Sequence, residues 1–474
     1  MSLIRAVVLA AGKGKRMKST MPKVLHEVLG KPMVARVLDA LDELNLEHIH
    51  IVVGHEARAI EEFLALHPPK TPWSSHRQDA QLGTGHALMQ VTPILNKFTG
   101  TLLVTTGDMP LLTSSTLGHL MQSHHEKQAT LSLLTTQMPD AGSYGRILRD
   151  DRGMVQGIVE YADANTQQKT IKEINTSTYC LEWPAIANGL QAITNDNQQK
   201  EYYLTDLIGW AYREKLSIAG YATDDWQQVQ GINSRLELAE ANRLLNIRVI
   251  RKLALELGVS VIDPLSTWIA PEVEVGRDTV ILPGCYLMGN VQIGCFCTIG
   301  PQTVIHGPVK IGDGTIINQS LLNKAQIGNN CRIGPFAHLR EMVLVGDEVK
   351  IGNFVEIKKS TIGNCSQAMH LSYLGDAMLG QNVNIGAGTI TANYDHVSKV
   401  KSKTSINDGV ATGCNSVLVA PVVVGKEAVV AAGTIVTSDV PEGSLVVRRA
   451  KEEIKSGWTE SRKRRLNLKK EAKI

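Results

Sequence analysis

Between residues 275 and 425 an aliphatic residue followed by glycine returns at spacings close to multiples of six. This period is typical of a hexapeptide β-helix, in which one aliphatic side chain in six points inward and the small residue after it lets the chain turn. A glycine-rich sheet with coincidental spacing is the weaker alternative. The pairs are Val275-Gly276, Ile293-Gly294, Ile299-Gly300, Ile311-Gly312, Ile327-Gly328, Ile333-Gly334, Val345-Gly346, Ile351-Gly352, Ile362-Gly363, Leu379-Gly380, Ile385-Gly386 and Val424-Gly425.

Before residue 235 short apolar runs alternate with amphipathic segments. The apolar runs predict buried strands, and the amphipathic segments predict helices. Such alternation indicates an α/β domain with a mostly parallel sheet, whose ligands gather at the carboxyl ends of the strands. The predicted strands are 6–9, 48–53, 101–105 and 130–136, and the predicted helices are 32–44 and 56–66.

The stretch 234–258 is rich in strong helix formers and has no glycine or proline before Gly258. It therefore predicts one long helix that ends at Gly258. A helix packed within the first domain is an alternative for its first half. The sequence thus predicts an α/β domain over 1–235, a helical linker over 236–258, and a β-helix domain with a basic tail over 259–474.

Composition narrows the class of protein. Aromatic residues make up 4% of the chain and hydrophobic residues 43%, which favours aliphatic cores. The net charge of +3 comes from the basic tail after residue 450, so we expect no general nucleic-acid binding. The seven cysteines show neither a zinc nor a disulfide pattern, as in a reducing cytoplasm. The apolar run 6–11 is too short to span a membrane, and we expect no membrane association.

A candidate phosphate-binding segment follows the first predicted strand. The segment Ala10-Ala11-Gly12-Lys13-Gly14-Lys15-Arg16-Met17 can bring backbone N–H groups and three cations to a polyphosphate. It is neither a Walker A motif nor a dinucleotide fingerprint, because no Ser/Thr follows a Gly-Lys and Met17 stands where a third glycine belongs. Lys23 adds another cation.

Two further motifs fall at predicted strand ends. Gln78 and the segment 81–87, Gln-Leu-Gly-Thr-Gly-His-Ala, form a second glycine turn whose amide side chains could read a base edge. Asp108 follows a buried strand directly in Thr106-Gly107-Asp108. A carboxylate there is placed to bind a hard cation, and magnesium bound to phosphates typically takes one or two protein ligands. A turn-forming aspartate is the alternative.

These motifs resemble those of the sugar-1-phosphate nucleotidylyltransferases. With the hexapeptide repeats, residues 3 to about 450 resemble a family of bacterial bifunctional enzymes, the N-acetylglucosamine-1-phosphate uridylyltransferase/glucosamine-1-phosphate N-acetyltransferases. The motifs that carry the resemblance, in the family's order, are 9–14, 81–85, 143–147, 173–176, 201–206 and 231–233.

The family resemblance implies a Rossmann-like nucleotidyltransferase domain joined by a long helix to a left-handed parallel β-helix. It also implies a cytoplasmic homotrimer that makes UDP-N-acetylglucosamine for peptidoglycan and lipopolysaccharide precursors. Its substrates would be small molecules, with acetyl-CoA and UTP as co-substrates. Acetyl transfer would come first and uridylyl transfer second.

For uridylyl transfer, the resemblance implies that Asp108 and Asn233 bind Mg²⁺ and that Lys23 contacts the UTP phosphates. The sugar phosphate would attack the α-phosphorus, with Mg²⁺, Lys23 and Arg16 neutralising charge and no protein nucleophile. The residues implied for UTP or UDP-sugar binding are Leu9, Ala10, Ala11, Gly12, Lys23, Gln78, Gly83, Thr84, Thr106, Gly107, Asp108, Gly145, Glu160, Asn175, Tyr203 and Asn233.

For acetyl transfer, the resemblance implies that His370 is the general base, since imidazole exchanges a proton near neutral pH. A structural histidine is the alternative, and this chain has fourteen histidines. The Ala387 N–H would bind the thioester oxyanion. The residues implied for the sugar phosphate are Arg340, Lys358, Tyr373, Asn384 and Lys399. Those implied for acetyl-CoA are Ala387, Asn393, Tyr394, Cys414, Ala432 and Arg449.

The chain departs from the family pattern at several positions. Thr106 stands where an aromatic residue is expected, and Cys414 stands where serine is usual, offering a weaker hydrogen bond. The loop that begins at Asn393 is too long for a coil corner. The tail after Ala450 could cover a neighbouring subunit and meet CoA phosphates, or it could be a solvated tail.

Two other functions compete with this interpretation. One is a sugar-1-phosphate nucleotidylyltransferase with a single activity and a structural solenoid, against which His370, Tyr373 and Asn384 argue. The other is a non-enzymatic assembly subunit. Lys23, Asp108 and Asn233 argue against that role, because a scaffold has no use for a phosphate and metal set.

Overall fold

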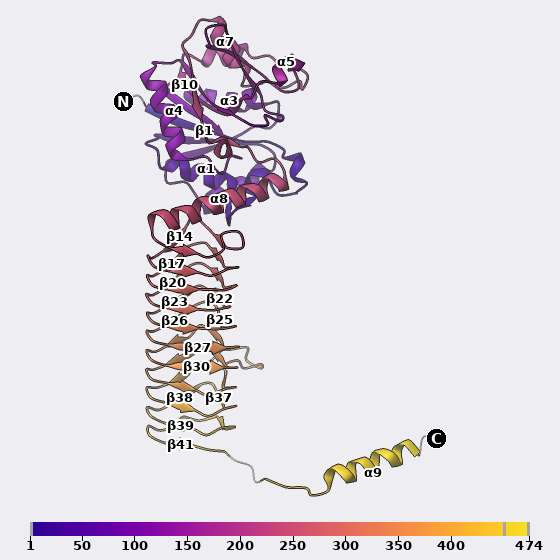
Figure 1. Cartoon of the computed structure of the whole chain (residues 1–474), viewed down its shortest axis with the longest axis vertical. Helices are drawn as coiled ribbons and strands as arrows, with labels where there is room; N and C mark the ends of the chain where they lie inside the picture. The colour runs from indigo at the N-terminus through magenta and orange to yellow at the C-terminus, as the bar shows by residue number, and fades with distance from the viewer. Residues whose placement is uncertain (1–2, 449–451, 472–474) are drawn as a thin grey trace. The chain divides into compact units, whose positions relative to one another are not determined.

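The computed structural model describes residues 3–448 and 452–471, and the chain forms two compact units, Met1–Val249 and Ile250–Ile474 (Figure 1). The helix α8, Arg235–Glu256, spans the division between them, and Gly258 follows it with a φ of 67°. This is the long helix that the sequence predicts. No helix within these described ranges has the length and apolar character that crossing a membrane requires.

Unit 1 contains a mostly parallel sheet in the order β11-β7-β10-β6-β1-β4-β5, with β8 and β9 attached beside β10. The antiparallel pairs in this sheet are those of β10 with β6, β7 and β8, and that of β8 with β9. The strands of unit 1 are β1 Leu3–Ala10, β4 His48–Val53, β5 Trp73–Arg77, β6 Gly100–Thr106, β7 Leu131–Gln137, β8 Arg146–Arg149, β9 Val155–Val159, β10 Glu173–Trp183 and β11 Ile218–Thr223, with the hairpin β2 Glu27–Val28 and β3 Lys31–Pro32.

Helices cover both faces of this sheet, which explains why residues 6–10 of β1 form an unbroken apolar run. Ala6 and Val8 point into one hydrophobic cluster, and Val7 and Leu9 point into another on the opposite face. The helices of unit 1 are α1 Met33–Asp42, α2 Ala57–Leu66, α3 Thr84–Met89, α4 Ser114–Glu126, α5 Thr166–Lys169, α6 Ala187–Ala192 and α7 Asp206–Arg213, with 3₁₀ turns η1 Lys15–Met17, η2 Lys23–Leu25, η3 Thr92–Leu95 and η4 Trp226–Val229.

Unit 2 is a parallel β-helix with three sheets, in which each strand from β12 to β37 pairs with a strand one coil further on, and β39 pairs with β41. The first sheet contains β12 Ser260–Val261, β15 Val280–Ile281, β18 Thr298–Ile299, β21 Ile316–Ile317, β24 Arg332–Ile333, β27 Lys350–Asn353, β30 Gln367–His370, β33 Asn384–Ile385, β36 Ala411–Thr412, β39 Val429–Val430 and β41 Leu445–Val446. The second contains β13 Trp268–Ile269, β16 Tyr286–Met288, β19 Val304–His306, β22 Leu321–Asn323, β25 His338–Leu339, β28 Glu356–Lys358, β31 Tyr373–Gly375, β34 Ile390–Ala392, β37 Val417–Val419 and β40 Ile435–Val436. The third contains β14 Val273–Val275, β17 Val291–Ile293, β20 Val309–Ile311, β23 Ala325–Ile327, β26 Val343–Val345, β29 Thr361–Ile362, β32 Ala377–Leu379, β35 Thr404–Ile406 and β38 Val422–Val424.

All twelve aliphatic residues of the predicted repeat are buried, so the hexapeptide interpretation is confirmed. The expectation that these glycines are needed for a turn holds for few of them. Among the glycines of these pairs only Gly300 and Gly334 have a positive φ. At the others a Cβ atom would lie within 3.0 Å of the next coil, as at Gly276, where it would meet the Cys295 nitrogen at 2.6 Å. Glycine is needed here because neighbouring coils approach closely.

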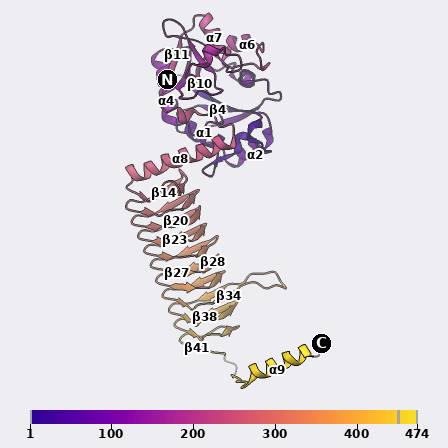
Figure 2. The same cartoon turned by 45° about the vertical axis from the view of Figure 1, so that its right-hand side comes forward.

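Two segments extend from the coils. The loop 393–403 lies between β34 and β35 and projects beside β34 (Figure 2). The chain ends in the helix α9, Trp458–Glu471, whose described side chains up to residue 468 are exposed. Cys285, Cys297 and Cys331 are buried in the coils, while Cys365 and Cys414 are exposed.

Three histidines of β4 and β5 converge on one hydroxyl group. Ser74 Oγ lies 2.9 Å from His48 Nε2, 3.1 Å from His50 Nδ1 and 2.9 Å from His76 Nε2. Burial lowers the pKa of His50 to about 3, with smaller contributions from His48, His76 and Arg5. The folded protein therefore keeps His50 neutral over a pH range in which the unfolded chain is protonated.

Acid is expected to destabilise unit 1 through His50. The unfolded histidine takes up a proton as the pH falls through 6.5, but folded His50 does so only near 3. The free energy of unfolding therefore falls as the pH is lowered from 6.5 to 3, by up to about 1.4 kcal/mol per pH unit. Denaturant unfolding at pH 7 and pH 4.5 should show a smaller acid loss in His50→Gln than in wild type. His125→Gln, at an exposed position, serves as the control, and an equal acid loss in His50→Gln and wild type would contradict the prediction.

Candidate functional sites in the two units

In unit 1 the structure brings together Lys23, Asp108 and Asn233. Lys23 Nζ donates hydrogen bonds to Asp108 Oδ2 and, at 2.7 Å, to Asn233 Oδ1. The Lys23 and Asp108 side chains are only 11% and 20% exposed. Asp108 follows β6 and Asn233 precedes α8, and Ile232 N donates to Asp108 O at 2.9 Å. Two residues that are 125 positions apart thus place one carboxylate and one amide oxygen beside the Lys23 ammonium group.

Electrostatics keep the Asp108 carboxylate ionised. Burial by itself would raise the pKa of Asp108, but the nearby Lys23 ammonium and the hydrogen bonds from Lys23 and Thr106 outweigh it, and the pKa is lowered. Thr106 Oγ1 donates to Asp108 Oδ1 at 2.6 Å. The threonine that replaces the expected aromatic residue therefore restrains the carboxylate.

The oxygen atoms of this group fit a hard cation. Asp108 and Asn233 supply two oxygen ligands, and magnesium accepts one or two carboxylates or carbonyl oxygens together with substrate phosphates. The described residues contain no cluster of three or more His, Cys, Asp or Glu side chains that could hold a metal on its own. The further ligands that magnesium takes in such sites are water molecules and substrate phosphates.

The loop after β1 lies beside this group. Leu9, Ala10 and Ala11 are buried, and Gly107 N donates to Leu9 O at 2.9 Å. A Cβ atom at Gly12 would meet nothing within 4 Å, so the backbone there faces open space. This exposed backbone is able to contact a ligand phosphate.

A second loop is held by the segment 201–204. Gln78 is 3% exposed, and its amide donates to Gly83 O at 3.0 Å and lies 3.0 Å from His86 Nδ1. Thr84 Oγ1 accepts from Leu204 N at 3.1 Å. Gly83 has a φ of 109°, and a Cβ atom there would lie 2.6 Å from Tyr202 O. Gln78 therefore shapes the glycine turn, and its amide nitrogen is already engaged.

Gly145, Glu160 and Asn175 form a third part of the site. Asn175 N donates to Gly145 O at 2.9 Å, and a Cβ atom at Gly145 would lie 3.3 Å from Glu160 Oε2. Thr205 Oγ1 donates to Glu160 Oε1 at 3.0 Å. Burial raises the pKa of Glu160 despite this hydrogen bond. Tyr203 is 8% exposed, so the predicted sugar residues lie in a largely buried region.

In unit 2 His370 ends β30 and is exposed. Its Nδ1 lies 3.0 Å from Asn353 Oδ1, on the neighbouring coil. Because an amide oxygen only accepts, Nδ1 carries the proton in a neutral imidazole. The lone pair is then on Nε2, which can act as a base.

The predicted phosphate-binding cations of unit 2 have carboxylate partners. Arg340 Nη1 donates to Glu356 Oε1 at 2.8 Å, and Lys358 Nζ lies 3.1 Å from Glu341 Oε1. A hydrogen bond from its own backbone N–H and then the Lys358 side chain lower the pKa of Glu341 to about 2. Both cations are thereby restrained but remain partly exposed.

Several predicted residues lie on coils close to His370. Gly388 N, next to Ala387, donates to His370 O at 3.4 Å. Tyr373 begins β31, and its hydroxyl group lies over Gly375, while Asn384 begins β33 with an exposed side chain. A Cβ atom at Gly413, next to Cys414, would meet Ala432 N at 2.3 Å.

The remaining predicted residues lie on or beyond the projecting loop. Asn393 is 6% exposed and donates to Asp376 Oδ2 at 2.5 Å. Tyr394 is 43% exposed, and Lys399 is also exposed. Within the described ranges no hydrogen bond or ion pair joins Lys399 to the other predicted residues. Arg449 lies outside the described residues.

Sequence reasoning missed the partners of these side chains. Asn353 precedes His370 by 17 residues and Glu356 follows Arg340 by 16, which is one coil in each case. The regular length of one coil could have indicated both pairs of neighbours. Thr205 lies within the family motif 201–206, and nothing in its spacing from Glu160 indicates that the two side chains meet.

Comparisons with known proteins cover both units. The family described as "MobA-like NTP transferase domain" matches residues 6–168, and the "GMPPB C-terminal domain" matches residues 266–369. UDP-glucose pyrophosphorylase complexed with UDP-glucose, a solved structure, aligns with a TM-score of 0.44 and 20% identity over 52% of this chain and 99% of its own. A TM-score this low does not establish a relationship.

Relatives over nearly the full length carry the name "Bifunctional protein GlmU". The protein from Exiguobacterium sibiricum is 46% identical over 453 residues, covering 96% of this chain and 99% of its own length. The proteins from Geobacillus sp. (strain WCH70) and Bacillus velezensis are each 45% identical, covering 98% and 96% of this chain and 98% of their own lengths. A Rossmann-like nucleotidyltransferase domain followed by a left-handed parallel β-helix of hexapeptide repeats is the fold class that the sequence predicts. The chain therefore belongs to the GlmU family of bifunctional enzymes, which have acetyltransferase and uridylyltransferase activities in UDP-N-acetylglucosamine synthesis.

Proposed function

We propose that the two units divide these activities. Unit 2 transfers the acetyl group of acetyl-CoA to glucosamine 1-phosphate, and unit 1 transfers the uridylyl group of UTP to N-acetylglucosamine 1-phosphate. The observation that carries the proposal is that each unit holds its own reactive group. These are the Lys23, Asp108 and Asn233 group in unit 1 and His370 in unit 2, paired with Asn353.

In uridylyl transfer a phosphate oxygen of the sugar attacks the α-phosphorus of UTP, the bond to the β-phosphate breaks, and pyrophosphate leaves. Asp108 and Asn233 would hold Mg²⁺, which would supply neutralisation of the phosphate charge. Lys23 and Arg16 approach the phosphates as cations, so no protein nucleophile is needed. Gly145, Glu160, Asn175 and Tyr203 hold the sugar. The remaining nucleotide contacts come from Leu9, Ala10, Ala11, Gly12, Gln78, Gly83, Thr84, Thr106 and Gly107.

In acetyl transfer the glucosamine amine attacks the thioester carbonyl carbon, and His370 Nε2 accepts the amine proton. The Ala387 N–H donates to the developing oxyanion. The carbon–sulfur bond then breaks, and the leaving sulfur takes up the proton held by His370, so that CoA leaves as a thiol. Arg340, Lys358, Tyr373, Asn384 and Lys399 hold the sugar phosphate, and Asn393, Tyr394, Cys414, Ala432 and Arg449 contact acetyl-CoA.

We also propose a cytoplasmic homotrimer. Its support is an exposed apolar column at successive coil corners, formed by Phe336, Phe354 and Leu371, which are 51%, 58% and 60% exposed. The first two rings stack with centroids 5.4 Å apart. Within the described ranges all seven cysteines are free, which suits a reducing compartment. Light scattering of the full chain would test the trimer, and a monomeric mass would contradict it.

The function is tested by following CoA thiol release and pyrophosphate release separately in the wild-type protein. Both signals are expected, each only with its own substrates. Pyrophosphate release without thiol release would leave the competing interpretation, a nucleotidylyltransferase with a structural solenoid. Failure to bind UTP with Mg²⁺ in calorimetry would favour a non-enzymatic subunit.

Removing residues 451–474 is expected to weaken acetyl-CoA binding. The described part of α9 carries four exposed cations, Arg462, Lys463, Arg464 and Arg465. A tail that covers the acetyl-CoA site would bring them to the CoA phosphates. Losing one or two charge-assisted hydrogen bonds would raise the Kd for acetyl-CoA about 10-fold. Calorimetry measures this change, and UTP binding is the control. An unchanged Kd for acetyl-CoA would discard the covering role.

A further inference from the structure

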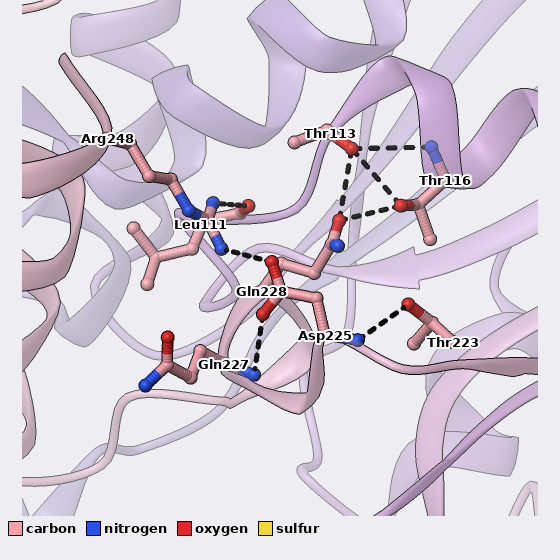
Figure 3. Close-up of polar contacts among 8 residues, drawn as sticks. All are labelled: Leu111, Thr113, Thr116, Thr223, Asp225, Gln227, Gln228 and Arg248. Atoms are coloured by element: carbon pink, nitrogen blue, oxygen red, sulfur yellow. Dashed lines mark hydrogen bonds and ion pairs between the residues drawn. The ribbon is translucent and has the colours of Figure 1, made fainter. Parts of the chain in front are cut away.

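On unit 1 a polar network joins the segment after Asp108 to the segment before Asn233 (Figure 3). Its centre is Gln228, whose Oε1 accepts hydrogen bonds from Thr116 Oγ1 at 2.7 Å and Thr113 Oγ1 at 3.0 Å. Gln228 and Thr116 are only 8% and 7% exposed. One buried amide oxygen thus joins η4 to the start of α4.

Arg248 of α8 adds a second connection between the same segments. Its guanidinium donates to Leu111 O at 2.8 Å and to Asp225 Oδ2 at 3.0 Å, and Figure 3 shows it reaching both. Asp225 Oδ1 also accepts from Gln227 N at 3.2 Å, at the start of η4. The rigid fork of one arginine side chain thereby sets the separation of two loops.

Both connections lie close in sequence to the candidate cation ligands. Leu111 is three residues after Asp108, and Gln228 is five residues before Asn233. Between these points Ile232 N donates to Asp108 O at 2.9 Å. The segments 108–116 and 225–233 are therefore joined at three places.

We infer that Thr116, Gln228 and Arg248 are positioning residues that hold Asp108 and Asn233 at the spacing that cation binding needs. The inference rests on the proposed uridylyl transfer. Arg248 holds the backbone of the first loop at Leu111, and the hydrogen bond between the Thr116 and Gln228 side chains joins residues that flank the two ligands. Support of this kind behind metal ligands typically changes metal affinity 10- to 100-fold when it is removed.

Paired substitutions separate the polar contact from general packing. Thr116→Val removes the hydroxyl donor at nearly constant volume, and Thr116→Ser keeps it. Arg248→Met removes both donated bonds, and Arg248→Lys keeps a cation beside Asp225. The full-length protein is titrated with Mn²⁺ in the presence of UTP and without sugar phosphate, and free Mn²⁺ is followed by electron paramagnetic resonance.

Thr116→Val and Arg248→Met are expected to raise the Kd for Mn²⁺ about 10-fold. Thr116→Ser is expected to stay within about threefold of wild type, because it retains the hydrogen bond to Gln228. The Mg²⁺ concentration for half-maximal pyrophosphate release should rise in parallel. Thiol release by unit 2 should be unchanged in every variant, and near-ultraviolet circular dichroism of the full-length chain checks that unit 1 is folded.

Wild-type Mn²⁺ affinity in both Thr116→Val and Arg248→Met would overturn the inference, as would an equal loss in Thr116→Ser and Thr116→Val. If one variant fails to fold, the other still decides. The proposed function fails separately. In that case the wild-type protein itself releases no pyrophosphate from UTP and sugar phosphate, whatever the variants do.

Discussion

His370→Ala is expected to reduce CoA thiol release about 10²- to 10⁴-fold, the usual contribution of a general base. The imidazole has its Nδ1 on Asn353 Oδ1, which leaves Nε2 to accept the proton of the attacking amine. Pyrophosphate release from UTP and N-acetylglucosamine 1-phosphate should be unchanged, because unit 1 contains its own group of polar residues. Separate steady-state assays of the two products measure both effects.

His306→Ala is the matched control, since His306 is an exposed histidine on β19 of the same β-helix. It should keep both activities. Asn353→Ala keeps the imidazole but removes its hydrogen-bond acceptor, so an intermediate loss of thiol release is expected. Thiol release at the wild-type rate in His370→Ala would remove His370 from the reaction.

Asp108→Asn is expected to reduce pyrophosphate release about 10²- to 10³-fold, as when one preorganised electrostatic contact is removed from a transition state. The substitution keeps the size of the side chain but removes the negative charge that faces Lys23. A neutral amide is also a weaker ligand for a hard cation than a carboxylate. Thiol release should be unaffected.

The control for this substitution is Asp79→Asn, at an exposed aspartate of the same unit. It should leave both activities unchanged. Calorimetry with UTP and Mg²⁺ should show weaker binding in Asp108→Asn than in the control. Pyrophosphate release close to the wild-type rate would show that Asp108 is not a ligand of the reacting complex.

Most of the fold could be predicted because its signals are local and periodic. The aliphatic residues of the hexapeptide repeat are buried where the period places them, and residues 6–10 of β1 are all apolar because both faces of the strand are covered there. The role of most repeat glycines was not predictable from one coil. A Cβ atom at Gly276 would meet the next coil at Cys295, nineteen residues further along the chain.

The candidate sites were predicted only in part, as sets of residue types at strand ends and coil interruptions. Asp108 and Lys23 stood out as a carboxylate and a cation near predicted strand ends, and Asn233 was implied by the family motif. The hydrogen bond of Thr106 to Asp108 was not foreseen, because the sequence showed only that an expected aromatic residue was missing. The sequence also did not indicate that three histidines meet at Ser74, because they come from two strands whose pairing is a tertiary property.

The sequence by itself determined the β-helix, the α/β domain, the long helix and the family, because these depend on periodic burial and on motifs that lie within a few residues. Only the tertiary structure decided which side chains meet. Lys23 lies between Asp108 and Asn233, His370 is oriented by Asn353, and Gln228 joins two loops through Thr113 and Thr116. Such contacts depend on where distant segments are brought by sheet order and coil stacking. A hydrogen bond forms within about 3 Å regardless of how many residues separate its partners.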